Sequence, residues 1–358
     1  MDFAHLPHPA PVPGETRAQA IADPGFGSVF TDHMVTIDYN VEKGWHSARI
    51  GPREALTIDP ACAVLHYAQE IFEGLKAYRH PDGSLALFRP HVNAARMNKS
   101  ADRLAMPHIP EDLFVEACRQ LVLKDRDWFP TVEGGSLYLR PFMFASENFL
   151  GVRPAREYKF LAIASPVGNY FKSGAPAVSI WVSQDYVRAA PGGTGAAKTG
   201  GNYAASLVPQ AEAIAKGHDQ VVFLDAVERR WIEELGGMNL FFVFDDGSVI
   251  TPPLGGTILP GVTRDSLIQL LRDEGLTIRE ERYAIDQWRA DAESGRLIET
   301  MACGTAAVVT PVGKVAAPDF EFTVGSGGPG QLTQRLRERL VGIQRGLVPD
   351  PHGWVETL

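Results

Sequence analysis

A lysine within a glycine-rich segment is the residue best suited to covalent chemistry in this sequence. Lys198 is one of only nine lysines against 25 arginines, and glycines at positions 192, 193, 195, 200 and 201 surround it. Glycine lets the backbone adopt positive φ angles and approach a ligand closely. A mobile loop with a solvated lysine would have the same composition. The functional alternative is an amine that forms an imine with a carbonyl cofactor.

Two phosphate-binding motifs do not fit this segment. The P-loop pattern GxxxxGK[ST] requires a glycine where Ala197 stands. The GxGxxG spacing of dinucleotide-binding loops is not met either. An amine presented for bond formation therefore remains the functional interpretation of Lys198.

Strand and helix patterns that alternate along the chain predict a mixed α/β protein around this loop. A hairpin is expected at Asp82-Gly83, and Pro90 and Pro110 each begin an amphipathic helix. Further helices are expected over residues 203–217, which end at a C′ glycine, 263–275 and 332–346. Strands are expected over residues 35–48, 63–79, 136–144, 157–167, 177–183, 219–225, 238–246, 248–253, 276–283 and 306–312.

Proline and glycine divide the chain into four parts. They crowd the N-terminus, which predicts an arm without regular structure over residues 1–29. A small α/β domain is expected over 30–166, and a Pro- and Gly-rich linker over 167–176. The remaining residues, 177–358, are expected to form the domain that carries Lys198.

Composition excludes several classes of partner. The formal charge is −9 with 45% hydrophobic residues, and no run of five basic residues could neutralise a nucleic-acid backbone. No apolar stretch approaches the roughly 18 residues that a membrane helix needs. Cys62, Cys118 and Cys303 are widely spaced, so neither a disulfide framework nor a zinc site is expected. The sequence predicts a cytoplasmic protein with reduced thiols and no metal.

The motif around Lys198, GTGAAKTGGNYAAS, resembles that of the branched-chain amino acid aminotransferases, which are pyridoxal-phosphate (PLP) enzymes of fold type IV. The resemblance covers about residues 30–345. It implies a smaller N-terminal α/β domain, a larger C-terminal domain with a barrel-like sheet, a cofactor at their interface and a homodimer. The other motifs that carry it are HYAQEIFEGLKAYR, LFRPHVNAARM, SLYLRPFMF, SPVGNYF, EELGGMN, PPLGGTILPGVTRDSL and CGTAAVV.

The resemblance assigns the catalytic roles. Lys198 would hold PLP as an internal aldimine at rest and then carry the proton between the substrate Cα and the cofactor C4′. Glu234 would keep the pyridine nitrogen protonated, and Tyr203 would meet the phenolate oxygen. The neighbouring Glu233 could be mistaken for that carboxylate, but the following L-G-G-M-N selects Glu234.

Fixed donors for the cofactor phosphate are implied at three places. Val262 and Thr263 begin a predicted helix, where free N–H groups and the helix dipole favour an anion. Arg96 resembles the family arginine that pairs with the phosphate, and Thr305 can donate a hydroxyl and an N–H group. Without the resemblance, these residues would be read as an ordinary helix cap, a solvated arginine and a turn.

The implied substrate pocket must accept an aliphatic side chain in one half-reaction and that of glutamate in the other. Arg140 is the expected partner of glutamate's distal carboxylate, although a strand-edge salt bridge would explain it equally. Leu150 and Val152 match residues donated by the dimer partner. The other expected pocket residues are Tyr67, Phe72, Tyr138, Tyr170, Gly237, Ala306 and Ala307.

The sequence departs from the family pattern at two places. Some members carry a redox-sensitive CxxC pair where Ala307 and Thr310 stand here, which excludes thiol switching by that pair. Gly237 stands where some members have a hydroxyl residue, so one substrate contact differs.

These motifs together predict a PLP-dependent transaminase that acts on leucine, isoleucine or valine with 2-oxoglutarate by a ping-pong mechanism. Within the same fold, a D-amino acid aminotransferase or an aminodeoxychorismate lyase would share the lysine and phosphate contacts. A non-catalytic PLP-binding or regulatory protein is the alternative from another class. The combination of Lys198, Glu234 and Tyr203 disfavours it, because binding alone needs no proton shuttle.

Overall fold

The computed structural model describes residues 1–168 and 177–358. Tyr170 and all but two residues of the expected linker therefore lie outside the described part. The chain divides into two compact units. The first contains Met1–Tyr170, Ala197–Gly200 and Ile343–Leu358, and the second contains Phe171–Ala196 and Gly201–Gly342. The short segment with Lys198 thus packs with the first unit.

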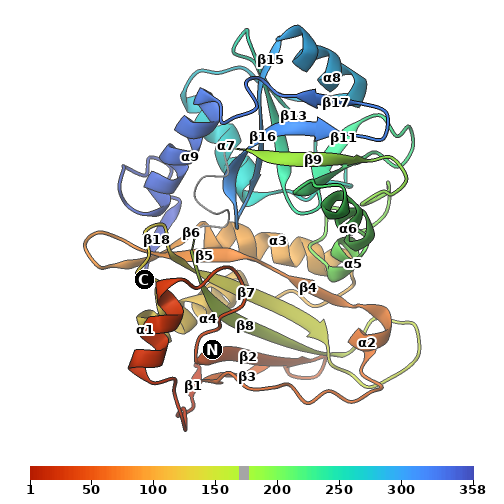
Figure 1. The fold of residues 1–358 in the computed structure, drawn as a ribbon. Helices are drawn as coiled ribbons and strands as arrows, with labels where there is room; N and C mark the ends of the chain where they lie inside the picture. Colours follow the sequence, from red (N-terminus) through yellow and green to blue (C-terminus); the bar gives the residue numbers. More distant parts are fainter. Residues whose placement is uncertain (169–176) are drawn as a thin grey trace. The chain divides into compact units, whose positions relative to one another are not determined.

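A mixed sheet organises the first unit. Its strands run in the order β1-β3-β2-β8-β7-β5-β6-β18, and β4 pairs with β7 (Figure 1). The strands are β1 Ala4–His5, β2 His33–Asn40, β3 Gly44–Pro52, β4 Glu70–Phe72, β5 Leu75–Arg79, β6 Leu85–Phe88, β7 Ser136–Ala145, β8 Glu157–Val167 and β18 Val355–Thr357. The helices are α1 Gly14–Ala22, α2 Ala63–Tyr67, α3 Pro90–Arg103 and α4 Glu111–Lys124, followed by a 3₁₀ turn at Arg126–Trp128.

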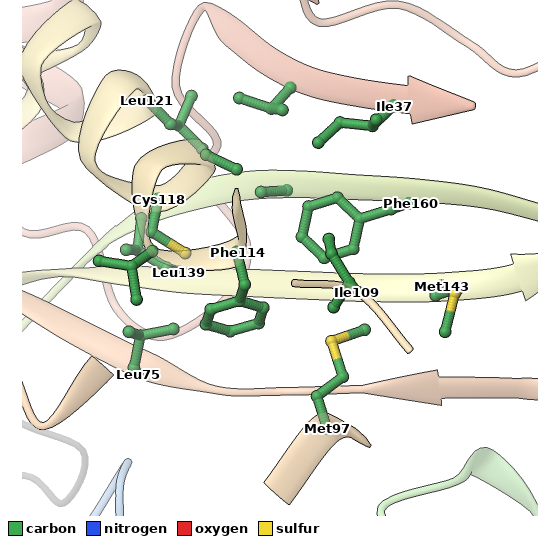
Figure 2. Packing of buried hydrophobic residues seen from close by; sticks show 14 of the residues in the cluster. Ile37, Leu75, Met97, Ile109, Phe114, Cys118, Leu121, Leu139, Met143 and Phe160 are labelled. Carbon is green, nitrogen blue, oxygen red and sulfur yellow. The ribbon is translucent and has the colours of Figure 1, made fainter. Parts of the chain in front are cut away.

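Helices α3 and α4 close the core of this unit. Pro90 is the first residue of α3, as expected, and α4 follows Pro110. Helix α4 packs on β2, β7 and β8, and α3 packs on α4 and β4. Figure 2 shows Phe114, Cys118 and Leu121 of α4 facing the sheet residues Leu139 and Phe160, all of them fully or almost fully buried. Each large apolar side chain buried here contributes about 1.5–3 kcal/mol.

The expected hairpin at Asp82-Gly83 is confirmed. Strands β5 and β6 pair antiparallel, and the His80 N–H donates to the Ser84 carbonyl at 2.9 Å. Gly83 has φ +85°, which only glycine adopts without strain. The Asp82 carboxylate accepts hydrogen bonds from the backbone and hydroxyl of Ser84. The strand that leads into the candidate site is therefore fixed by a local turn.

Three sequence predictions for the secondary structure are wrong. Residues 63–67 form helix α2 and not a strand, and a left-handed Ala68 ends that helix. The N-terminal arm contains β1 and helix α1, and the Val12 N–H donates to the buried Asp32. The single helix expected over 203–217 is two helices, because Pro209 lacks an N–H group and can stand only near a helix start.

The second unit is built on another sheet, of order β11-β10-β9-β16-β15-β12-β13-β14, with β17 on β16. Its strands are β9 Val178–Ser183, β10 Gln220–Leu224, β11 Ile232–Leu235, β12 Asn239–Phe244, β13 Val249–Thr251, β14 Ile278–Glu280, β15 Leu297–Gly304, β16 Val308–Ala316 and β17 Glu321–Thr323. The helices of this part of the chain are α5 Gly200–Ala204, α6 Leu207–Ala215, α7 Val262–Asp273, α8 Ile285–Ser294 and α9 Gln331–Gln344.

Strand β15 shows why some elements of this unit escaped prediction. Glu299 and Thr300 are buried in mid-strand, which breaks the apolar pattern. The Glu299 carboxylate accepts the N–H groups of Leu332 and Thr333 at the start of α9, at 3.0 and 2.8 Å. Strand β11 and helix α8 were also not predicted. The predicted mixed α/β architecture is confirmed.

The described residues contain no helix long and apolar enough to cross a bilayer. Among the same residues, no group of three or more His, Cys, Asp or Glu side chains could hold a metal ion. Cys62, Cys118 and Cys303 are free and buried. Burial raises the pKa of the Cys303 thiol to about 12, which makes it unreactive near neutrality.

The packing in Figure 2 predicts the effect of truncating Phe114. Replacing Phe114 by alanine should lower the free energy of unfolding by about 3–5 kcal/mol, because a fully buried ring is removed and a cavity remains. Chemical denaturation followed by circular dichroism measures the loss. Val92→Ala on the partly exposed face of α3 is the matched control. An equal effect of the two substitutions would contradict the assignment of Phe114 to the core.

Candidate functional site

Three contacts within the first unit hold the backbone around Lys198. The Lys198 N–H donates to the Ser100 hydroxyl on α3 at 2.9 Å, and its carbonyl accepts the Phe72 N–H of β4 at 3.0 Å. Two residues later, the Gly200 N–H donates to the carboxylate of Glu70. The segment thus runs as an extra, partly paired stretch beside β4. A lysine held in this way is fixed in position.

The Lys198 amine lies in a desolvated and electropositive environment. Its nitrogen is 4.7 Å from the centre of the Phe72 ring. The pKa of the amine is lowered to about 8, mainly by burial and also by the Arg96 cation, while Glu73 opposes the shift. A substantial fraction of the amine is therefore uncharged near neutral pH, which a nucleophilic amine requires. A solvated loop lysine would keep its ordinary pKa.

Arg96 is held by a buried carboxylate that the sequence analysis did not single out. Its Nε and Nη2 donate to the two oxygens of Glu73 at 2.8 and 2.7 Å. The Glu73 side chain is fully buried and also accepts the Asn93 amide at 2.8 Å. This two-pronged pair fixes the guanidinium plane. The signal for Glu73 was present, since an acidic residue stands within the apolar run IFEGLKAY.

Phe72, Tyr138 and Arg140 form one wall of this site. The register of β4 and β5 against β7 places them on one face of the sheet. The Arg140 guanidinium lies 4.8 Å from the centre of the Phe72 ring and donates to the Tyr138 hydroxyl at 3.2 Å. A Cβ atom on Gly74 would overlap that hydroxyl, so glycine is required there.

The Arg140 side chain keeps one buried donor in reserve. Its Nε has no hydrogen-bond partner among the described residues. A buried, unsatisfied donor on a cation costs free energy and indicates an anionic or polar ligand. The wall can therefore present positive charge and aromatic surface to the same small molecule.

The expected pocket residues from the dimer partner lie at the surface of the first unit. Tyr67 ends helix α2, and its hydroxyl donates to the Leu150 carbonyl. The side chains of Leu150 and Val152 are largely exposed, at 64% and 89%. Tyr170 lies outside the described residues. The structure therefore places Tyr67 beside Leu150 but does not bring Val152 to Lys198.

The second unit surrounds a different buried charge, the carboxylate of Glu234 on β11. It accepts the Leu259 N–H at 2.8 Å and pairs with the Arg188 guanidinium at 2.9 Å. Both side chains are almost fully buried, at 2% and 1% exposure. Arg188 also donates to the Thr257 carbonyl at 2.8 Å. Nothing in the sequence around Arg188 distinguished it from a surface arginine.

Glu233 and Glu234 lie on opposite faces of β11. Glu233 accepts a hydrogen bond from the Thr257 hydroxyl, and burial raises the pKa of its carboxyl group. Glu234 instead faces Arg188 and Asn239, whose amide lies 3.5 Å from the carboxylate. Adjacent carboxylates with the period of a strand are thus separated into different environments.

Asn239 joins the Glu234 region to the start of helix α7. A Cβ atom on Gly261 would overlap the Asn239 side-chain oxygen. Gly261 is the N-cap of α7 and provides no side-chain cap, and Val262 and Thr263 form the buried first turn. The N–H groups of a first turn carry a partial positive charge that favours an anion. The motifs EELGGMN and LPGVT therefore meet within this unit.

Tyr203 and the turn after β15 complete the expected set. The Tyr203 ring lies 3.7 Å from the position of a Cβ atom on Gly237, so a larger residue there would contact the ring. Thr305, Ala306 and Ala307 form the turn between β15 and β16. Arg337, which was not predicted, donates to the Val309 carbonyl at 2.6 Å. The β-branched Val308 has φ +62°, a strained conformation that the turn and Arg337 impose.

A family model and a relative in sequence match this chain. The model described as amino-transferase class IV matches residues 70–315. The sequence is 54% identical over 362 residues to the branched-chain-amino-acid aminotransferase of Mycolicibacterium smegmatis. That alignment covers 100% of this chain and 98% of the relative. The match therefore extends across both compact units.

Solved structures share the fold. The branched-chain amino acid aminotransferase of Escherichia coli superimposes with a TM-score of 0.75 at 31% identity, covering 86% of this chain and 96% of the other. A second branched-chain amino acid aminotransferase, from T.th. and complexed with N-(5'-phosphopyridoxyl)-L-glutamate, gives a TM-score of 0.73 at 29% identity. It covers 89% of this chain and 97% of the other.

Removing the guanidinium of Arg188 should destabilise the protein. Arg188→Met leaves the Glu234 carboxylate buried without its cation, which should cost about 3–5 kcal/mol in the free energy of unfolding. Arg282→Met is the control, because Arg282 and its partner Glu228 are both exposed and 3.7 Å apart. Urea titration of both variants measures the difference. Unchanged stability of Arg188→Met would show that the Glu234 charge does not depend on this pair.

Proposed function

Because the chain belongs to the class IV aminotransferase family, we propose that it is a PLP-dependent transaminase. It exchanges the amino group between leucine, isoleucine or valine and 2-oxoglutarate by a ping-pong mechanism. The observation that carries the proposal is the Lys198 amine, which is fixed in position and desolvated so that its pKa falls to about 8. The names of the relative and the solved structures support the substrate class.

The residues present fit PLP. A nucleophilic amine, a buried carboxylate and an uncapped helix N-terminus match its aldehyde, ring nitrogen and phosphate. The solved structure that contains a phosphopyridoxyl group supports the same assignment. When bound, PLP supplies an electron sink that makes the α-proton of an amino acid labile.

Lys198 has two roles in this proposal. Its Nζ binds the cofactor at rest and, when an amino acid displaces it, accepts the proton that leaves the substrate α-carbon. The lowered pKa keeps this nitrogen uncharged for both tasks. The contacts to Ser100 and Phe72 fix the backbone from which the side chain acts. Proton transfer needs such a fixed donor–acceptor geometry.

The remaining groups bind and orient the cofactor. Glu234, with its charge stabilised by Arg188 and the Leu259 N–H, would hold a proton on the pyridine nitrogen. Tyr203 would donate its hydroxyl to the phenolate oxygen. The phosphate would be bound by Arg96, the hydroxyl of Thr305 and the N–H groups of Val262 and Thr263.

The substrate side chain would lie against the wall formed by Phe72, Tyr138 and Arg140. The aromatic rings suit an aliphatic side chain, and the Arg140 guanidinium suits the distal carboxylate of glutamate. Gly237, Ala306 and Ala307 would contact the substrate from the second unit. The proposal includes a homodimer in which Leu150 and Val152 serve the partner's pocket with Tyr67 and Tyr170. Three free cysteines favour the cytoplasm.

Replacing Lys198 by alanine should abolish transamination. Loss of the nucleophile and proton carrier should lower kcat for leucine with 2-oxoglutarate by about 10⁴-fold or more. Borohydride should fix PLP to the wild-type chain at Lys198, and mass spectrometry should find no adduct in the variant. A wild-type enzyme active on D-alanine but not on L-leucine would instead indicate a D-amino acid aminotransferase. Absence of turnover with any amino acid would indicate a binding protein.

The pKa of Lys198 predicts how apoenzyme captures PLP. Only the uncharged amine reacts, so the capture rate should rise about tenfold per pH unit below pH 8 and level off above it. An exposed lysine would give a rate that still rises at pH 9.5, because its pKa stays near 10.4. Stopped-flow absorbance after mixing apoenzyme with PLP measures the profile. A rate that continues to rise through pH 9.5 would be inconsistent with a desolvated Lys198.

A further inference from the structure

A carboxylate shares the face of the sheet that carries the proposed substrate wall. Strand β4 pairs antiparallel with β7, with Glu70 opposite Phe144 and Phe72 opposite Phe142. Side chains two residues apart on a strand point to the same face. Glu70 therefore lies on the same face as Phe72 and Arg140. No role in cofactor or substrate binding has been assigned to it above.

Two cations flank the Phe72 ring on this face. The Lys198 nitrogen lies 4.7 Å from the ring centre, and the Arg140 guanidinium carbon lies 4.8 Å from it. The Arg140 side chain thus extends along β4 in the direction of Glu70. Arg140 also acts on Glu70 electrostatically, since its charge lowers the pKa of that carboxyl group against the larger, opposite effect of burial.

Hydrogen bonds place the Glu70 carboxylate. Its Oε1 accepts the Gly200 N–H and lies 3.5 Å from the Thr199 hydroxyl. A Cβ atom on Gly200 would overlap the same oxygen, so the contact depends on glycine. The carboxylate is therefore held beside the segment that carries Lys198, where it cannot swing away to solvent.

The two proposed substrates make opposite demands on Arg140. The distal carboxylate of glutamate neutralises the guanidinium, whereas the side chain of leucine offers no charge. A partly buried cation facing an aliphatic group is costly unless another anion lies nearby. A fixed carboxylate on the same face would offset that cost with the aliphatic substrate and would weaken binding of the dicarboxylate.

We propose that Glu70 is a specificity-determining residue that balances the charge of Arg140 when an aliphatic side chain occupies the pocket. Glu70 thereby keeps the pocket permissive for branched-chain substrates at some expense in affinity for 2-oxoglutarate. This inference rests on the proposed function. It concerns a residue that touches the lysine segment and acts on substrate through Arg140.

The test compares two amino-group acceptors with purified holoenzyme. Glu70→Gln keeps an oxygen acceptor for the Gly200 N–H but removes the charge. The ratio of kcat/KM for 2-oxoglutarate to that for the 2-oxo acid of leucine should rise about fivefold, mainly through KM. Glu70→Asp keeps the charge and should leave the ratio near that of wild type. Glu42→Gln, an exposed residue in the β2–β3 turn, controls for loss of a negative charge.

Further results separate a charge effect from a structural one. A Glu70→Gln variant that loses activity with both acceptors alike, at an unchanged ratio, would overturn the inference. Should Glu70→Gln prove unstable, Glu70→Asp decides the question through the double variant with Arg140→Gln. Without the Arg140 cation, Glu70→Asp and Glu70 should give the same ratio, and a persisting difference would refute the coupling. A wild-type enzyme that uses neither acceptor would refute the proposed function.

Discussion

The desolvation of one amine governs the chemistry that this chain can perform. Lys198 carries a nitrogen whose pKa falls to about 8 because burial and the Arg96 cation both disfavour its charge. An uncharged lysine is useful only if it stays where the reacting carbon will be. Contacts from α3 and β4 to the Lys198 backbone supply that constraint. The first unit thus provides both the environment and the position of the nucleophile.

The charged groups around the proposed site are arranged in opposed pairs. Arg96 is fixed by Glu73, and Glu234 is fixed by Arg188, in each case with both partners buried. Removing one member of such a pair leaves an uncompensated buried charge, so each pair is sensitive to substitution. Arg140 differs, because the fixed anion on its face of the sheet, Glu70, is bound to the lysine segment and leaves the guanidinium available to a ligand.

Glycine positions in the motifs have separate physical causes. Gly74 makes room for the Tyr138 hydroxyl, and Gly261 makes room for the Asn239 side chain. Gly200 allows its N–H group to approach Glu70. In each case a side-chain atom of a neighbouring strand occupies the space of a Cβ atom. The glycines of these motifs therefore report close packing around the site more than flexibility of the chain.

The sequence by itself determined the mixed α/β architecture, the hairpin at Gly83 and the helices α3 and α4, because local periodicity and turn chemistry fix such elements. It also indicated the family through ordered motifs. Helix α2, the break at Pro209 and strand β15 depended on tertiary contacts, such as the pairing of buried Glu299 with the start of α9. Glu73, Arg188 and Glu70 emerged only from the structure. A charged residue gains its role from what the fold brings beside it, and sequence spacing does not encode that distance.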